Sequence, residues 1–191
     1  MAVSRIKGSP LSTISLDIDF SASDSEDVVI PITHKMSHIF RGRLYIDTDP
    51  GAAFSAWAKY TFYNKAAMRG EDAFYRTEAK LVYTELEDPT VIGSPDITPD
   101  DHTDFSPNDL ALILGASEEY VRLKTIADTM VAEDNLLAVH PVDTGLVRIS
   151  EFSGFSLFNN EGDSDVYLNI SFAVAQTVSL KMELLVRGFY G

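Results

Sequence analysis

Cysteine is absent from the 191-residue chain, and histidine and tryptophan are scarce, with four residues and one residue respectively. Without thiols the chain has no disulfide framework, no thiolate zinc site, no iron–sulfur cluster and no cysteine nucleophile. Apolar runs are short, and none approaches the ~20 residues that a membrane-spanning helix requires. Within residues 1–11 no apolar run follows Arg5 and Lys7, so we expect no secretory signal.

Positive charge is also in short supply. Lysine and arginine total 15 against 29 aspartates and glutamates, which gives a net charge of −14 at pH 7. Because a field of this sign repels phosphate backbones and anionic lipid, we expect no specific nucleic-acid binding and no membrane partner. Hydrophobic residues make up 45% of the chain, which is enough to fill the core of one domain of this length.

Alternation of apolar and polar side chains is the strongest pattern in the sequence, and it is typical of half-buried β-strands. Residues 54–63 and 73–86 show it clearly, and we expect them to be antiparallel neighbours. Residues 166–174 and 178–186 also alternate, and the residues between them are expected to form a hairpin tip. Further strands are expected at residues 11–20, 28–32, 43–47, 135–140 and 145–158, with an acidic turn at residues 24–27.

Residues 87–106 gather acidic residues and prolines, so we expect a long extended loop with little to bury. Ser106 and Pro107 are then typical of a helix start. An apolar stripe at helical spacing follows, formed by Tyr120, Leu123, Ala127, Met130 and Val131. The sequence therefore favours a short helical insertion at residues 106–133, and a strand through residues 121–127 is the competing interpretation.

Eight or more strands in one domain must bury their apolar faces against one another. The expected fold class is therefore mainly β. We expect an antiparallel β-sandwich or a jelly-roll-like barrel, formed by residues 1–191 as a single domain, with the acidic loop and the helical insertion as additions.

No catalytic signature is present along the chain. His34 and His38 are four residues apart, but they fall in an expected strand-to-loop passage without a glutamate, so no metal site is expected there. A Gly-x-Ser-x-Gly elbow and a phosphate-binding glycine loop are both missing. Residues 159–165 are rich in oxygen ligands but lack the spacing of an EF-hand loop, so we interpret them as a solvated turn.

We therefore expect no enzyme activity, no catalytic residue, no cofactor and no metal. A hydrolase that uses a carboxylate pair is one alternative, but 29 acidic residues are too many to point to one pair.

One strand face carries two large aromatic side chains. Trp57, Lys59, Thr61 and Tyr63 share this face of residues 54–63. If the face is covered, the rings belong to the core, which is the interpretation that a layered fold favours. If the face is exposed, Trp57 and Tyr63 suit the binding of a sugar ring, and the chain is a carbohydrate-binding module.

The last residues include Phe189 and Tyr190, and an apolar aromatic end is expected to dock against a neighbouring subunit. With its all-β pattern and acidic composition, the chain resembles small virion proteins of tailed bacteriophages, such as tail-tube, baseplate, decoration or attachment components. The resemblance implies a structural protein in the virion that contacts copies of itself and other virion proteins. It also implies rings of subunits in which an acidic surface lines a channel for DNA. A protein not encoded by a phage would be cytoplasmic.

Overall fold

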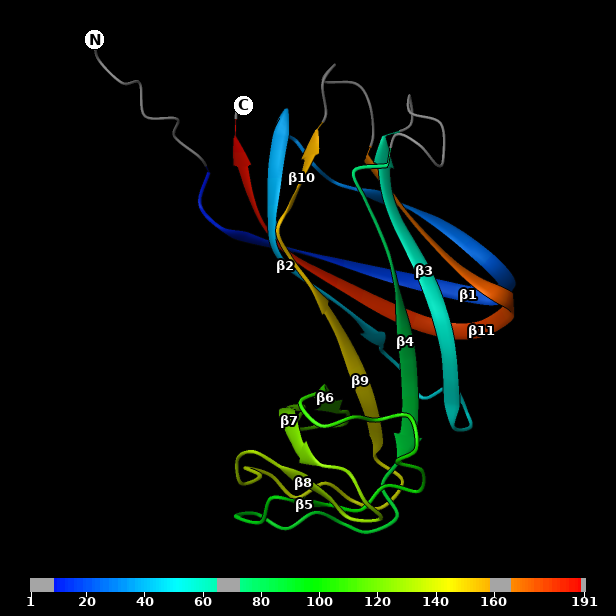
Figure 1. Ribbon diagram of the computed structural model, residues 1–191, viewed down its shortest axis with the longest axis vertical. Coiled ribbons are helices and arrows are strands. Elements are labelled where there is room, and N and C mark those ends of the chain that lie inside the picture. The colour runs from blue at the N-terminus through cyan, green and yellow to red at the C-terminus, as the bar shows by residue number, and fades with distance from the viewer. Residues whose placement is uncertain (1–8, 65–72, 159–165, 190–191) are drawn as a thin grey trace.

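The computed structural model describes residues 9–64, 73–158 and 166–189, and every regular element in these ranges is a β-strand (Figure 1). All pairings between the strands are antiparallel, which confirms the mainly β fold class. In chain order the strands are β1 (Ser12–Ile30), β2 (Met36–Ile46), β3 (Phe54–Asn64), β4 (Tyr75–Glu85), β5 (Asp96–Ile97), β6 (Leu110–Ile113), β7 (Glu119–Thr125), β8 (Met130–Ala132), β9 (Gly145–Phe152), β10 (Phe155–Phe158) and β11 (Val166–Phe189).

Five strands close into a barrel. The first part of β11 pairs with β3 and its last part pairs with β2, while β4 and β9 complete the ring between β3 and β2. One continuous sheet thus closes on itself, and its inward side chains fill the interior. This barrel core includes Leu44, Tyr60, Phe62, Leu81 and Leu168, together with the inward side chains of β1.

β11 is one strand of 24 residues and not the predicted pair of strands joined by a hairpin tip. β1 runs along it from Ser12 opposite Val186 to Ile30 opposite Val166, so the predicted turn at residues 24–27 is also wrong. The register shifts between Ser21 and Ser25, where both strands bend together. Figure 1 shows this ribbon folding back on itself, which brings the two halves of β11 to different neighbours. In the sequence, a bend interrupts the alternation of apolar and polar residues in the same way as a turn does, so this alternation does not distinguish a bent strand from two strands joined by a turn.

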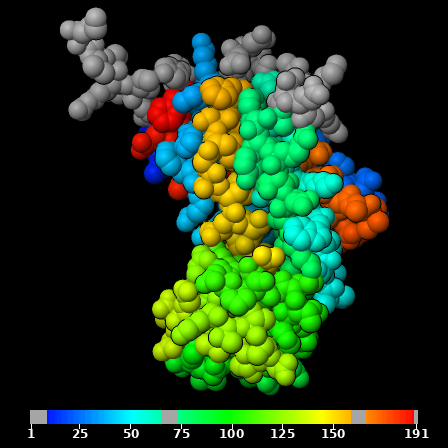
Figure 2. Space-filling model, viewed as in Figure 1, coloured from blue at the N-terminus to red at the C-terminus, as the bar shows by residue number. Residues whose placement is uncertain are grey.

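A lobe lies at the end of the barrel opposite the start of β1 and the end of β11 (Figures 1 and 2). Its sheet starts at β9 and continues through β6, β7 and β8 to β5. A second core lies inside the lobe and contains Leu86, Ile97, Phe105, Leu123 and Met130. Because Ile97 and Phe105 belong to residues 87–106, the prediction that this acidic segment has little to bury is wrong.

The predicted helical insertion at residues 106–133 is also wrong, since the segment forms β6, β7 and β8. The competing strand interpretation is confirmed in β7, where the buried Val121 and Leu123 alternate with exposed neighbours. β6 looks helical in sequence because its apolar run is unbroken. The run is unbroken because Leu112 faces the barrel core while Ala111 and Ile113 face the lobe core.

Gly42 lies where β2 pairs with β9 and the barrel closes. Gly42 stands opposite Phe152, and a Cβ added to Gly42 would lie 2.1 Å from Cζ of the Phe152 ring. The ring therefore occupies the space that any larger residue at position 42 needs.

We expect Gly42→Ala to lower the free energy of unfolding by about 1–3 kcal/mol, because overpacking forces the ring or the strands to shift. Urea unfolding followed by circular dichroism measures this change. Ser21→Ala, at an exposed position of β1, is the control and should stay within about 0.5 kcal/mol of the parent. Adding Phe152→Leu to Gly42→Ala should recover part of the loss. Equal stability of Gly42→Ala and the control would contradict this explanation.

Candidate functional site

β3 presents two faces of opposite character. Ala58, Tyr60 and Phe62 point inward and are buried in the barrel core. On the outer face Trp57 is 57% exposed, and Lys59 is exposed as well. The prediction that this face belongs to the core is therefore wrong for Trp57, because the barrel buries only the inner face of the strand.

Tyr63 differs from Trp57, although both lie on the outer face of β3. Tyr63 is buried and stacks on Tyr167, which lies opposite it on β11, with the ring centroids 5.5 Å apart. Burial raises the pKa of the Tyr63 phenol, and Tyr167 raises it further. The two candidate sugar-binding rings are six positions apart, which is about 20 Å along a strand. The structure therefore does not bring them together around one sugar.

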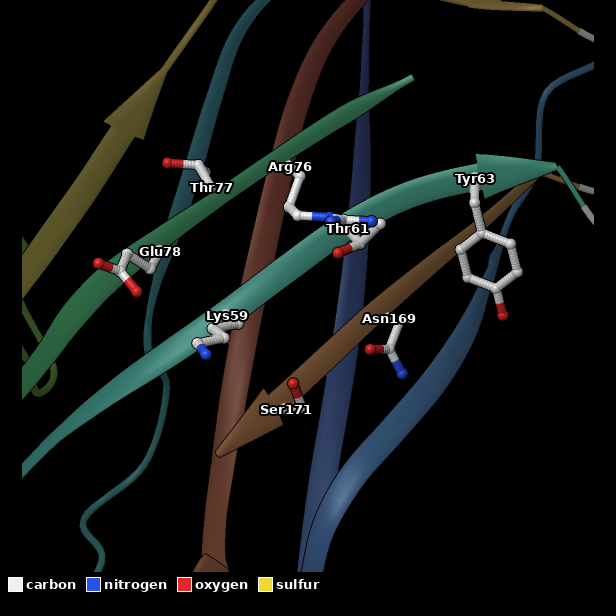
Figure 3. A pocket seen from close by; sticks show the side chains of 8 residues that line it. All are labelled: Lys59, Thr61, Tyr63, Arg76, Thr77, Glu78, Asn169 and Ser171. Carbon is white, nitrogen blue, oxygen red and sulfur yellow. The ribbon is translucent and has the colours of Figure 1, made fainter. Parts of the chain in front are cut away.

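The outer face of β3, β4 and β11 is hollowed beside Tyr63 (Figure 3). The hollow has a volume of about 610 Å³. Because all three strands belong to the barrel, the backbone fixes the spacing of the side chains on its floor. Strand pairing arranges these side chains in two rows across the sheet, Glu78–Lys59–Ser171 and Arg76–Thr61–Asn169.

Asn169 links the hollow to β1. Its Nδ2 donates hydrogen bonds to Ser25 Oγ at 2.9 Å, to Asp27 Oδ1 at 2.7 Å and to the Glu26 carbonyl at 3.3 Å. These bonds commit the amide nitrogen to β1 and hold the side chain in one orientation.

A second hollow, of about 390 Å³, adjoins the first, because Glu78 lines both. It begins at Trp57 and crosses β4 to β9 and β6. Glu151 accepts hydrogen bonds there from Arg43 Nε at 3.2 Å and from an Arg122 guanidinium nitrogen at 3.5 Å. We call the two hollows together the outer groove.

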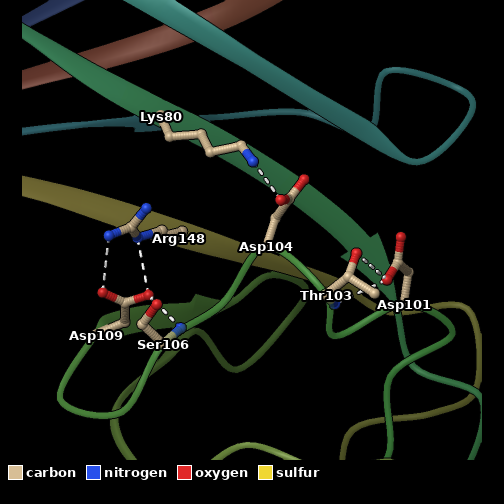
Figure 4. Close-up of polar contacts among 7 residues, drawn as sticks. All are labelled: Lys80, Asp101, Thr103, Asp104, Ser106, Asp109 and Arg148. Carbon is tan, nitrogen blue, oxygen red and sulfur yellow. Dashed lines mark hydrogen bonds and ion pairs between the residues drawn. The ribbon is translucent and has the colours of Figure 1, made fainter.

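Two cations beside the second hollow fasten the acidic segment to the barrel (Figure 4). Arg148 forms a bidentate ion pair with Asp109. Its Nε lies 2.9 Å from Oδ2, and its Nη2 donates a hydrogen bond to Oδ1 at 2.9 Å. Lys80 Nζ donates to Asp104. Charge-assisted hydrogen bonds from β4 and β9 therefore attach the acidic segment, and the residues that follow it up to Asp109, to the barrel.

Hydrogen bonds also lower the pKa of two aspartates in this segment. Asp101 accepts bonds from the backbone N–H and the hydroxyl of Thr103, both 2.8 Å long, and these hold its pKa below the usual 3.8. For Asp104 the bond from Lys80 is the main cause of the lowered pKa, and Ser55 contributes a further bond. Both carboxylates therefore stabilise the folded state as anions.

The lobe exposes five aliphatic side chains, a feature that the sequence analysis missed. We call them the lobe patch: Val91, Ile92, Leu137, Val139 and Val142. Leu137 is 83% exposed. The patch lies on two segments, residues 90–93 and 136–142. Backbone hydrogen bonds hold these segments side by side: Thr90 N–H donates to the His140 carbonyl and Gly93 N–H donates to the Leu136 carbonyl, both at 2.9 Å. Residues 135–140 were predicted to be a strand, but they are irregular and turn Leu137 and Val139 outward.

A buried polar pair fixes the lobe patch from beneath. His140 is only 2% exposed, and its Nε2 lies 3.1 Å from Oε2 of Glu119. Glu119 also accepts hydrogen bonds from the backbone N–H groups of Leu137 at 2.7 Å and Ala138 at 3.2 Å. The Thr90 hydroxyl oxygen accepts a bond from the His140 N–H at 2.8 Å. Since these side chains hold the backbone of the patch, its shape is preorganised.

The remaining candidate residues do not converge. His38 Nδ1 lies 3.0 Å from Ser156 Oγ, while the His34 ring packs against Gly188. Among the residues that the structure describes, no group of three or more His, Asp or Glu is arranged to hold a metal ion. Phe189 ends β11 opposite Met36, whereas Tyr190 and the oxygen-rich residues 159–165 lie outside the described residues.

We compared the chain with known proteins. No family model and no curated protein matches it. No helix within residues 9–64, 73–158 and 166–189 is long and apolar enough to cross a membrane. The outer groove and the lobe patch are the two surfaces with features of a binding site.

The lowered pKa of Asp104 predicts how acid weakens the fold. Its contribution to stability is complete above the usual aspartate pKa of 3.8 and is lost as the pH falls through the lowered value. We expect Asp104→Asn to flatten the dependence of the unfolding free energy on pH in this acid range. Lys80→Met should flatten it similarly, and the double variant should add little to either. Urea unfolding at several pH values measures this, and an unchanged pH dependence in both variants would contradict the assignment.

Proposed function

We propose that this chain is a non-enzymatic structural protein that assembles with copies of itself through the lobe patch. The observation that carries the proposal is the exposure of five aliphatic side chains on two segments joined by hydrogen bonds. Single exposed apolar side chains are ordinary on a protein surface, whereas a gathered group is typical of a binding surface.

The rigidity of the lobe patch supports the same proposal. Glu119, Thr90 and His140 hold its backbone by hydrogen bonds. A surface that is already ordered loses little conformational entropy when a partner covers it. More of the free energy of burying Leu137 and its neighbours is therefore available for association.

The charges around the lobe patch favour one arrangement of the copies. Glu87, Asp88, Asp134 and Asp143 are exposed and flank the patch residues in the chain. Two such patches placed face to face would bring carboxylates together, which disfavours a symmetric contact of patch with patch. A head-to-tail contact with a more basic surface of the next copy avoids this, and repeated contacts of that kind generate rings or filaments.

The barrel offers a surface of suitable shape and charge for the other side of this contact. Thr13, Arg41, Arg43, Glu183 and Leu185 line a small hollow of about 180 Å³ on β1, β2 and β11. A hollow of this kind suits one aliphatic side chain such as Leu137, and its two arginines suit an acidic rim. A ring built in this way accords with the proposed role as a virion component of the tailed-bacteriophage kind.

Paired variants test the head-to-tail contact. We expect the parent protein to form oligomers whose mass rises with concentration in size-exclusion chromatography with light scattering. Leu137→Asp removes the aliphatic side chain that would enter the hollow, and Arg41→Glu reverses a charge in the lining of the hollow. Each variant should weaken association by about tenfold or more, as substitutions at interface hot spots do. Mixing the two variants should restore one good contact and give a dimer, because each variant keeps the surface that the other lacks.

Val174→Asp is the matched control, since Val174 is an exposed aliphatic residue at the bend of β11, outside the lobe. This variant should assemble like the parent. A parent protein that stays monomeric at high concentration would overturn the proposal. Normal assembly of Leu137→Asp would also overturn it.

A further inference from the structure

We propose that the outer groove binds an uncharged oligosaccharide, with the indole of Trp57 as the surface on which a sugar ring stacks. This function goes beyond self-assembly and uses a different surface, because no residue of the lobe patch lines either hollow. Trp57, the polar floor of the groove and the balance of charge in the groove support this assignment.

Trp57 is placed as a binding side chain and not as a core side chain. It is the only tryptophan in the chain, and more than half of its surface is exposed. Trp57 pairs with Lys80 of β4, and the pairing of β3 with β11 begins at the next residue, Ala58, so the backbone under Trp57 is held by the sheet. A flat apolar ring with an N–H donor at its edge, kept in a fixed place, provides the surface that the C–H face of a sugar ring covers.

The floor beside Trp57 offers hydrogen-bonding groups that the protein itself leaves unused. Lys59 and Glu78 stand opposite each other on β3 and β4, yet neither has an ion-pair or hydrogen-bond partner among the described residues. Asn169 commits its amide nitrogen to β1, and no described residue donates a bond to its Oδ1. The groove thus presents an ammonium donor, a carboxylate acceptor and an amide acceptor in rows, a mixture that matches hydroxyl groups.

The charge of the groove points to a ligand without net charge. Lys59 and Arg76 bring positive charge to the first hollow and Glu78 brings negative charge, with Asp27 bound to Asn169 at its border. In the second hollow Arg148 is paired with Asp109 and Arg122 with Glu151. Because the local charges nearly cancel while the whole chain carries −14, phosphate and uronate chains are repelled.

The size of the groove fits a short chain of sugars. The first hollow of about 610 Å³ lies within the ~300–1,000 Å³ typical of small-molecule sites. The second hollow continues it past Trp57 over β4. Trp57 lines the second hollow and lies two residues from Lys59 in the first, so a sugar of a linear chain that follows the groove would cover the indole.

The single tryptophan makes a direct test in the native protein. We would titrate the full chain with cellohexaose, maltohexaose and chitohexaose as uncharged probes and with a hyaluronan hexasaccharide as a charged probe. Binding of an uncharged probe should shift the Trp57 emission to shorter wavelength and protect it from acrylamide, because the ring leaves water. The hyaluronan probe should leave both signals unchanged.

Variants then separate groove binding from other causes. Calorimetry with the best uncharged probe should show an affinity loss of about tenfold or more for Glu78→Gln and for Trp57→Ala, since each removes a direct contact. Phe40→Ala, which removes an exposed aromatic side chain that lines neither hollow, should bind like the parent.

Two results would overturn the inference. The first is the absence of any change in Trp57 emission or quenching with every uncharged probe at millimolar concentration. The second is unaltered affinity of both groove variants. Neither result bears on self-assembly, which light scattering measures through Leu137 and Arg41, so the two proposals fail independently.

Discussion

The pairing of β1 with β11 is the constraint on which the rest of the structure depends. The two strands stay in register on either side of a shared bend, with Phe20 opposite Val178 and Ile30 opposite Val166. Because β11 bends, one half reaches β3 and the other half reaches β2, and the barrel closes between them. A straight ribbon of this length would extend past the sheet and leave the barrel core open on one side.

Closure of the barrel decides which surfaces remain for function. The inner face of β3 packs in the core, so its outer face is left to contact solvent or a partner. Trp57 lies on this outer face. Where the lobe covers β4, β6 and β9, both faces of these strands are buried, as Leu81 and Val82 show by facing different cores. The lobe therefore has a firm base, and its loops can hold aliphatic side chains outward without losing their shape.

The outer groove and the lobe patch lie on different parts of the molecule and are compatible with each other. No residue of the lobe patch or of the small hollow on β1, β2 and β11 lines the outer groove, although Arg43 of that hollow pairs with Glu151 at the edge of the groove. Arg148 and Asp109, which pair with each other, and Lys80, which pairs with Asp104, also line the side of the groove. Fastening of the lobe and the shape of the groove thus depend on shared contacts.

The sequence by itself determined the strand character of most segments, because the period of two in β3 and β4 reflects one buried face. It also placed Ala58, Tyr60 and Phe62 together on one side of β3. Only the tertiary structure decided that β1 and β11 bend without turning, that β6 is a strand with two buried faces, and that Trp57 faces solvent. The physical reason is that local spacing records which side chains share a face, whereas the layer that covers each face comes from residues far away in the chain.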